Sequence, residues 1–170
     1  MTDFEQLFRE HGAYVLRLSR RLGVRPADAE DVAQEVFLVV HQALSRFEGR
    51  SSHRTWISGI CVRVVSNYRR KAHRRHEQAG EPPVEPAELR DPERAAIGSS
   101  GLAQLDAALS KLSEPQRASF VLFEIEQLSV VEISEALGCS KFTTYARLQA
   151  ARRAVQKAFE ADAVLEVADV

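Results

Sequence analysis

The sequence predicts an all-α protein with two small helical domains joined by an acidic linker. Apolar residues recur at helical spacing through residues 4–76 and again through 102–159. Between these blocks, residues 77–101 contain four of the six prolines, six acidic residues and no aromatic residue. A segment of that composition cannot bury enough surface to fold by itself. We expect domains over residues 1–76 and 102–160, a flexible linker over 77–101 and a tail over 161–170.

Composition limits the classes of function. The net charge of -1 divides unevenly: residues 1–76 carry 14 Lys and Arg against 8 Asp and Glu, whereas residues 77–101 carry 2 against 6. A basic first block indicates local contact with nucleic acid. No apolar run approaches the roughly 20 residues that cross a bilayer, so we expect a cytoplasmic protein without membrane insertion.

The sequence gives little indication of a metal site or a bound cofactor. Cys61 and Cys139 stand far apart, without a Cys or His at ligand spacing, so we expect two reduced packing residues. An enzyme is the weakest alternative: His73 and His76 are the best candidates for a metal pair, but they lie in a basic tract that repels cations. We expect no cofactor, no metal and no catalytic residue.

The first two helices should pack on each other. One runs from Phe4 to Leu22 and ends at Gly23; the next begins near Pro26 and Asp28. The inner face of the second helix comprises Ala29, Val32, Ala33, Val36, Val40 and Leu44. Its outer face comprises Asp31, Gln34, Glu35 and Leu38. Such a face can be solvated surface, or it can dock a basic partner helix through the leucine and the acids.

A third helix, over residues 54–76, carries the basic tract. Apolar residues from Ile57 to Tyr68 gather on one side, while Gly59, Arg63, Ser66, Asn67, Arg70 and Arg74 gather on the other. Trp56 lies at the border. Cations hold phosphates and flat groups stack on unpaired bases, so this helix suits a nucleic-acid strand. A solvated basic helix with its Trp in the core is equally compatible. The preceding loop, residues 47–55, could line a base pocket or simply turn the chain.

The second domain has the pattern of a helix-turn-helix. Capping boxes at Ser113–Gln116 and Ser129–Glu132 open two helices, Gly138 ends the second, and Ser140 caps a longer helix to about Phe159. In this last helix Thr144, Leu148, Ala151 and Val155 should face inward, and Phe142, Tyr145, Gln149 and Arg153 outward. DNA binding is the favoured interpretation, although such units also serve in protein contacts.

These motifs together resemble bacterial sigma factors of the extracytoplasmic function (ECF) group, which have only sigma domains 2 and 4. The resemblance lies in residues 28–37 (DAEDVAQEVF), in residues 47–70 with Thr55-Trp56-Ile57 at their centre, and in residues 112–153 with QLSVVEISEALG over 127–138. It implies a non-catalytic protein that binds core RNA polymerase, through the β′ clamp helices and the β flap, and directs it to promoter DNA. It also implies control by an anti-sigma protein, for which residues 159–170 and Leu38 are candidate contacts. A frayed terminus is the favoured interpretation of residues 159–170.

The resemblance also implies roles for residues. The polymerase-binding set is Asp28, Asp31, Gln34, Glu35 and Leu38. The set that reads and melts the −10 element is Arg50, Ser51, His53, Trp56, Arg63, Asn67, Arg70, Lys71 and Arg74. The set that reads the −35 element as duplex is Lys141, Phe142, Thr143, Tyr145, Arg147, Gln149, Arg152 and Arg153.

The sequence departs from the family pattern at four positions. Arg63 stands where the family usually has Asn, Tyr145 and Ala150 where it is often basic, and Phe142 where a small residue is common. We therefore expect an atypical −35 preference, with more stacking or methyl contact. A competing interpretation is a regulator that binds duplex DNA through residues 113–157 without engaging polymerase; the motif at residues 28–37 opposes it.

Overall fold

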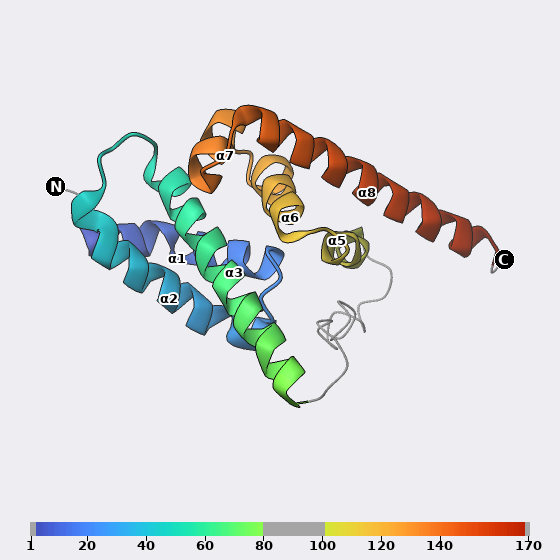
Figure 1. The fold of residues 1–170 in the computed structure, drawn as a ribbon, viewed down its shortest axis with the longest axis horizontal. Coiled ribbons are helices and arrows are strands. Elements are labelled where there is room, and N and C mark those ends of the chain that lie inside the picture. Colours follow the sequence, from blue (N-terminus) through green and yellow to red (C-terminus); the bar gives the residue numbers. More distant parts are fainter. Residues whose placement is uncertain (1–2, 80–100, 169–170) are drawn as a thin grey trace.

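The computed structural model describes residues 3–79 and 101–168, and Figure 1 shows their arrangement. Over these residues the chain forms seven α-helices. The expected linker falls almost wholly in residues 80–100, outside the described residues. The all-α prediction is confirmed.

The first domain is a bundle of three helices around an apolar core. Its elements are α1 (Phe4–Arg21), a 3-10 turn (Pro26–Asp28), α2 (Ala29–Ala43), a second 3-10 turn (Leu44–Arg46) and α3 (His53–Ala79). Leu18 from α1, Val36 from α2 and Ile57 from α3 are fully buried together. Tyr14 and Ser58 share a buried hydrogen bond of 2.6 Å between α1 and α3. The predicted inner faces of the second and third helices therefore form one core together with α1.

The second domain contains the predicted helix-turn-helix. Its elements are α5 (Gly101–Ser110), α6 (Glu114–Phe120), a π-helical turn (Val121–Ile125), α7 (Val130–Leu137) and α8 (Lys141–Ala168). Both capping boxes are present, at Ser113 and Ser129. Gly138 ends α7 at φ 62°, a left-handed conformation that glycine adopts without strain. The helix expected to end near Phe159 continues to Ala168.

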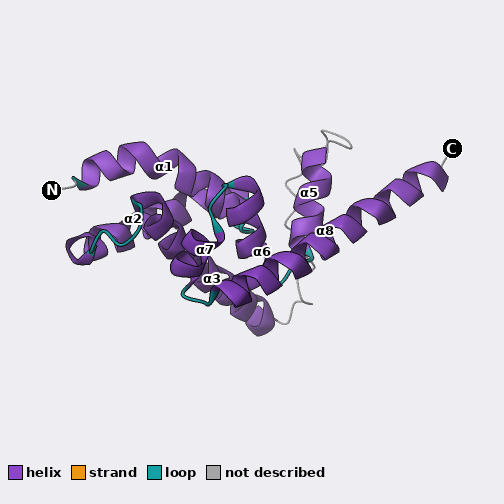
Figure 2. Cartoon of the chain, turned by 90° about the horizontal axis from the view of Figure 1, so that it is seen from above, coloured by secondary structure: helices purple, strands orange, loops and turns teal. Residues whose placement is uncertain are grey.

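The two domains pack against each other. In Figure 1, α7 lies on the upper part of α3, and α6 approaches the same helix lower down. Viewed from above in Figure 2, α8 runs from this junction past α5 and projects away from the body. None of the helices in residues 3–79 and 101–168 combines the length and the apolar character of a membrane span.

The cysteines behave as packing residues. Cys61 and Cys139 are both free, and Cys61 is buried in the first domain against Ser19. Burial raises the pKa of the Cys61 thiol to about 12, so it stays protonated at neutral pH. Cys139 is half-buried, beside the Thr144 hydroxyl. The prediction of two reduced cysteines agrees with this structure.

Candidate nucleic-acid interface

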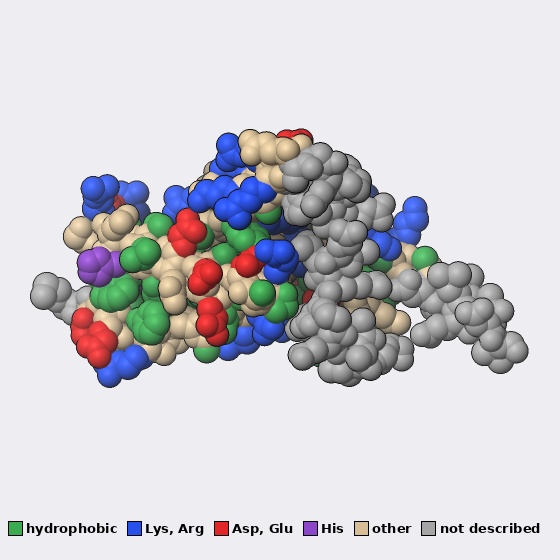
Figure 3. All heavy atoms as spheres, turned by 90° about the horizontal axis from the view of Figure 1, so that it is seen from below, with side chains coloured by type: hydrophobic (Ala, Val, Ile, Leu, Met, Phe, Trp, Pro, Cys, Tyr) green, Lys and Arg blue, Asp and Glu red, His purple; other side chains and the backbone are tan. Residues whose placement is uncertain are grey.

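The outer face of α2 is exposed as predicted. Asp31, Gln34 and Glu35 all face solvent, and Leu38 is 63 % exposed. Figure 3 shows acidic side chains set among hydrophobic ones on the lower face of the molecule. Leu38 therefore projects into solvent next to these acidic side chains, and the whole outer face of α2 is accessible.

Asp28 differs from the other four residues of the predicted polymerase set. Its carboxylate accepts a hydrogen bond of 2.5 Å from Tyr68 of α3 and one of 2.8 Å from Arg25. These contacts lower the pKa of Asp28, the Tyr68 hydroxyl being the largest cause. Asp28 therefore connects the start of α2 to α3 through its hydrogen bond with Tyr68. The sequence alone did not predict this contact.

The loop before α3 places a small aromatic cluster at the surface. The Phe47 ring lies 4.8 Å from that of Trp56 and 4.7 Å from that of His53. Trp56 and His53 are partly exposed, so Trp56 lies at the border of the core, as its helical position predicted. Arg50 is exposed and pairs with Glu48, while the Ser51 side chain is partly exposed. The cluster offers ring faces next to cations.

Beyond Trp56, α3 carries a line of exposed polar groups. Arg63 donates from Nε to the Gly59 carbonyl at 3.3 Å, and Arg70 donates to the Asn67 side chain. Lys71 and Arg74 continue the line and are exposed. Five of the predicted −10 residues, Arg63, Asn67, Arg70, Lys71 and Arg74, thus share one accessible edge of a single helix.

The N-terminal half of α8 presents aromatic residues to solvent. Phe142 is 83 % exposed and Tyr145 is 57 % exposed. Lys141, Gln149 and Arg153 are exposed as well, whereas Thr144 and Leu148 are buried, as predicted. Thr143 is held by Ser140, which accepts from its backbone N–H at 3.0 Å. These exposed side chains can contact the edges of base pairs in a DNA groove while the buried side of α8 stays packed in the second domain.

Two arginines predicted on this surface have partners within the protein. Arg152 donates from Nε to Glu124 at 2.6 Å and lies over the Phe123 ring. Arg147 points away from the Phe142 side, with its Nη1 3.6 Å from the Cys139 sulfur, and it lines a pocket between the domains. The structure therefore does not bring Arg147 together with the exposed aromatic residues.

The contact between the domains was not predicted from the sequence. Arg54 of α3 donates to the Glu126 carboxylate and to its backbone carbonyl, each at 3.1 Å. Thr55 donates to Glu132 at 3.1 Å, next to the capping hydrogen bonds from Ser129 that are the main cause of the lowered pKa of Glu132. The residues in these two pairs lie 72 and 77 positions apart in the chain, so no local sequence pattern could predict that they meet.

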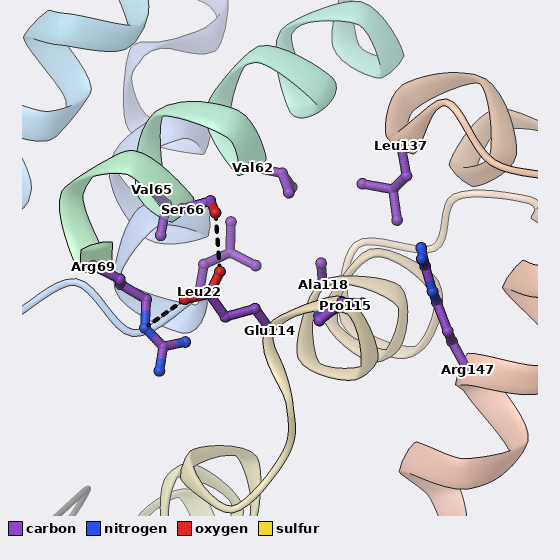
Figure 4. A pocket seen from close by; sticks show the side chains of 10 residues that line it. All are labelled: Leu22, Val62, Val65, Ser66, Arg69, Glu114, Pro115, Ala118, Leu137 and Arg147. Atoms are coloured by element: carbon purple, nitrogen blue, oxygen red, sulfur yellow. Dashed lines mark hydrogen bonds and ion pairs between the residues drawn. The ribbon is translucent and has the colours of Figure 1, made fainter. Parts of the chain in front are cut away.

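A pocket of about 160 Å³ lies within this contact, and Figure 4 shows its lining. Val62 and Val65 of α3 form one wall, opposite Ala118 and Leu137 of the second domain. At one side Glu114 accepts from Ser66 at 3.0 Å and pairs with Arg69 at 3.5 Å. The part of α3 covered here adjoins the edge that carries Arg63 and Asn67.

Comparison with known families matches both domains. Residues 7–75 match sigma-70 region 2, and residues 102–155 match sigma-70 region 4. The ECF RNA polymerase sigma factor SigC of Mycobacterium tuberculosis is 32% identical over 134 residues, which cover 79% of this chain and 71% of SigC. The chain is an ECF-type RNA polymerase sigma factor. The resemblance noted in the sequence is confirmed.

Solved structures agree with this membership. A structure of CnrH in complex with the cytosolic domain of CnrY is 26% identical, with a TM-score of 0.70 over 94% of this chain and 88% of that one. The sigma factor RpoE of Bartonella quintana, solved with the anti-sigma factor NepR, has a TM-score of 0.75 over 95% of this chain and 99% of that one; at 21% identity it shows the fold alone. This ECF sigma factor directs transcription initiation, and sigma factors are non-catalytic.

Proposed function

We propose that this sigma factor binds core polymerase through the outer face of α2. Exposed Asp31, Gln34 and Glu35 would face a basic partner, and Leu38 would supply the apolar contact. The proposed partner of this face is the pair of β′ clamp helices of the polymerase. Asp28 contributes by setting where α2 begins. The proposed partner of the second domain, which is sigma domain 4, is the β flap. A factor that works on core polymerase acts in the cytoplasm.

We propose that α3 and the loop before it read and melt the −10 element. The cluster of Trp56, Phe47 and His53 offers ring faces to unstacked bases, and the Arg63 edge offers donors and cations to the strand. Removing a base from the duplex costs a few kcal/mol, which stacking and phosphate contacts offset. The observation that supports melting of the −10 element is that the exposed Arg63 edge of α3 lies next to the partly exposed rings of Trp56 and His53.

We propose that α8 reads the −35 element as duplex. Phe142 and Tyr145 are suited to apolar contact with thymine methyl groups, and Lys141 and Arg153 to phosphates. Because Arg147 and Arg152 have partners inside the protein, few free guanidinium groups remain for guanine. This supports the expectation of an atypical −35 preference.

One observation supports the whole function: three separate exposed surfaces, on α2, on α3 and on the first half of α8, lie on one chain. The test is to add the purified protein to core RNA polymerase on genomic templates and to sequence the RNA 5′ ends. We expect defined start sites, each preceded by two short boxes with a fixed gap. Start sites identical to those of core polymerase alone would refute the function.

Arg63→Ala should impair promoter opening more than duplex binding. Arg63 lies on the proposed melting edge, and its side chain makes one weak contact, to the Gly59 carbonyl. We expect open complexes, measured by permanganate reactivity of thymines, to form about tenfold more slowly. A hydrogen bond from a charged group is worth about 1.5–3 kcal/mol, and each 1.36 kcal/mol is about a tenfold change in rate. Binding to a −35 duplex should stay within about twofold. Arg9→Ala, which removes an exposed arginine of α1, is the control. Equal losses in both assays would contradict this placement of Arg63.

We also propose control by an anti-sigma protein. The support is the likeness in fold to the Bartonella quintana sigma factor RpoE, which was solved with the anti-sigma factor NepR, together with the exposed Leu38. The tail, residues 159–170, remains a candidate contact, and α8 extends through most of it. An inhibitor that covers the α2 face would compete directly with polymerase for Leu38.

A further inference from the structure

The pocket between the domains has an apolar middle. Val62 and Val65 of α3 lie opposite Ala118 of α6 and Leu137 of α7, across a space of about 160 Å³ (Figure 4). An apolar cavity of about 150 Å³ is large enough to hold a benzene molecule. The space therefore suits a compact apolar group with the size of one six-membered ring or a short branched chain. None of the proposed contacts with polymerase or promoter uses this space.

The charges at one end of the pocket compensate each other. Glu114 accepts a hydrogen bond from Ser66 at 3.0 Å and pairs with Arg69 at 3.5 Å, and Figure 4 draws both contacts. The carboxylate and the guanidinium are therefore each occupied by a group of the protein. This end offers a ligand neither a free cation nor a free anion.

Arg147 leaves the opposite end of the pocket positively charged. Its side chain is half-buried on α8 and points toward Leu137 of α7. Within residues 3–79 and 101–168, its one hydrogen bond goes to the Cys139 sulfur at 3.6 Å, and no carboxylate pairs with it. A guanidinium has five N–H donors, and a thiol is a weak acceptor. Most donors of Arg147 are therefore open to a group that enters the pocket.

A small organic monocarboxylate matches this combination of an apolar middle and one uncompensated cation. The two oxygens of a carboxylate accept the parallel N–H donors of a guanidinium, and such charge-assisted pairs are stronger than neutral hydrogen bonds. A neutral ligand would leave Arg147 unpaired, and a cation would be repelled by it. A second carboxylate on the ligand would be repelled by Glu114, and inorganic phosphate would leave the apolar middle empty.

We propose that this pocket binds a small monocarboxylate with a ring or a branched chain, whose carboxylate pairs with Arg147 and whose apolar body lies between Val62 and Leu137. Arg147 would then have a role that its direction away from Phe142 does not allow on the −35 surface. Val62 directly precedes Arg63 in α3, so the ligand would lie behind the edge that is proposed to melt the −10 element. Binding would need neither polymerase nor DNA.

Benzoate is the probe for this site, because it carries one carboxylate on one six-membered ring. Binding to the full-length protein is followed by NMR of the valine and leucine methyl groups. We expect the methyl signals of Val62, Val65 and Leu137 to shift together and to saturate, with a dissociation constant of about 1 mM. The methyl signals of Val15 and Val36, in the core of the first domain, should stay in place. Shifts that do not saturate, or that spread over both domains alike, would overturn the proposal.

Three related compounds separate the contribution of the charge from that of the ring. Benzamide keeps the ring without a charge, benzylamine reverses the charge, and acetate keeps the carboxylate without a ring. Each should bind at least about tenfold more weakly than benzoate, because each lacks either the charge-assisted pair or the apolar body. Benzamide that binds as tightly as benzoate would rule out recognition of a carboxylate.

Two variants connect binding to the residues of the pocket. Arg147→Gln should weaken benzoate at least about tenfold and leave benzamide unchanged, because only benzoate uses the charge. Arg20→Gln is the matched control: it makes the same change at an exposed position of α1, two residues from the pocket residue Leu22, and should bind benzoate like wild type. Val62→Phe should fill the apolar middle and prevent binding of benzoate and benzamide alike.

Wild-type affinity for benzoate in Arg147→Gln would overturn the proposed pairing, and so would an equal loss in Arg20→Gln. The Arg147→Gln result stands whether or not Val62→Phe folds, since Arg147 is only half-buried. These titrations use the free protein without polymerase. Their outcome is therefore separate from that of mapping transcription start sites, which tests the proposed function.

Discussion

Asp31→Arg combined with Glu35→Arg should reduce binding of core polymerase by about 100-fold or more. Both carboxylates are exposed on α2 beside Leu38, so the change places two cations where a basic partner helix is proposed to dock. Disrupting charge pairs in an interface typically costs about 2–5 kcal/mol, and every 1.4 kcal/mol is a tenfold change in affinity. The dissociation constant for core polymerase, measured with a labelled sigma factor, is the readout.

The control for net charge is Glu5→Arg combined with Glu10→Arg. These acids are exposed on α1 and make the same change in total charge without touching the α2 face. We expect the control to bind polymerase within about threefold of wild type, since exposed charges away from an interface contribute little. If both double variants bind equally well, the α2 face is not the docking surface.

Phe142→Ala combined with Tyr145→Ala should weaken binding to a −35 duplex by about 10–100-fold. Each ring is proposed to contact base edges or thymine methyl groups, and such contacts discriminate by about 1–3 kcal/mol. The thermal midpoint should scarcely change, because exposed side chains outside the core usually contribute less than about 0.5 kcal/mol. Binding is measured with the full-length protein by fluorescence anisotropy on the duplex identified from mapped promoters.

Phe8→Ala is the matched loss of an exposed aromatic residue, since Phe8 is half exposed but lies on α1 in the first domain. It should leave duplex affinity unchanged. An unchanged affinity in the Phe142→Ala, Tyr145→Ala protein would mean that the rings serve another contact, and that −35 recognition depends on Lys141, Gln149 and Arg153. Swapping thymine for uracil at the contacted positions, which removes only the methyl group, would distinguish methyl contact from stacking.

The faces of individual helices could be predicted because they follow from local spacing. The exposed set on α2, the buried Thr144 and Leu148 of α8, and the capping boxes at Ser113 and Ser129 all depend on residues within two turns of each other. Family membership followed for the same reason, since its motifs are short and continuous. The sequence predicts the end of α8 near Phe159, but no residue there stops a helix, and α8 continues to Ala168.

Sequence alone thus determined the helices, their exposed and buried sides, and the family. Tertiary structure alone decided what the polar residues between the helices do: Asp28 binds Tyr68, Arg147 turns toward the first domain, and Glu126 lies against Arg54. Helical periodicity reports which side of a helix avoids water, but it cannot tell whether a polar side will be covered by a second domain. Val62 and Leu137 come to line one pocket only when segments far apart in the chain meet, because packing joins residues by distance in space.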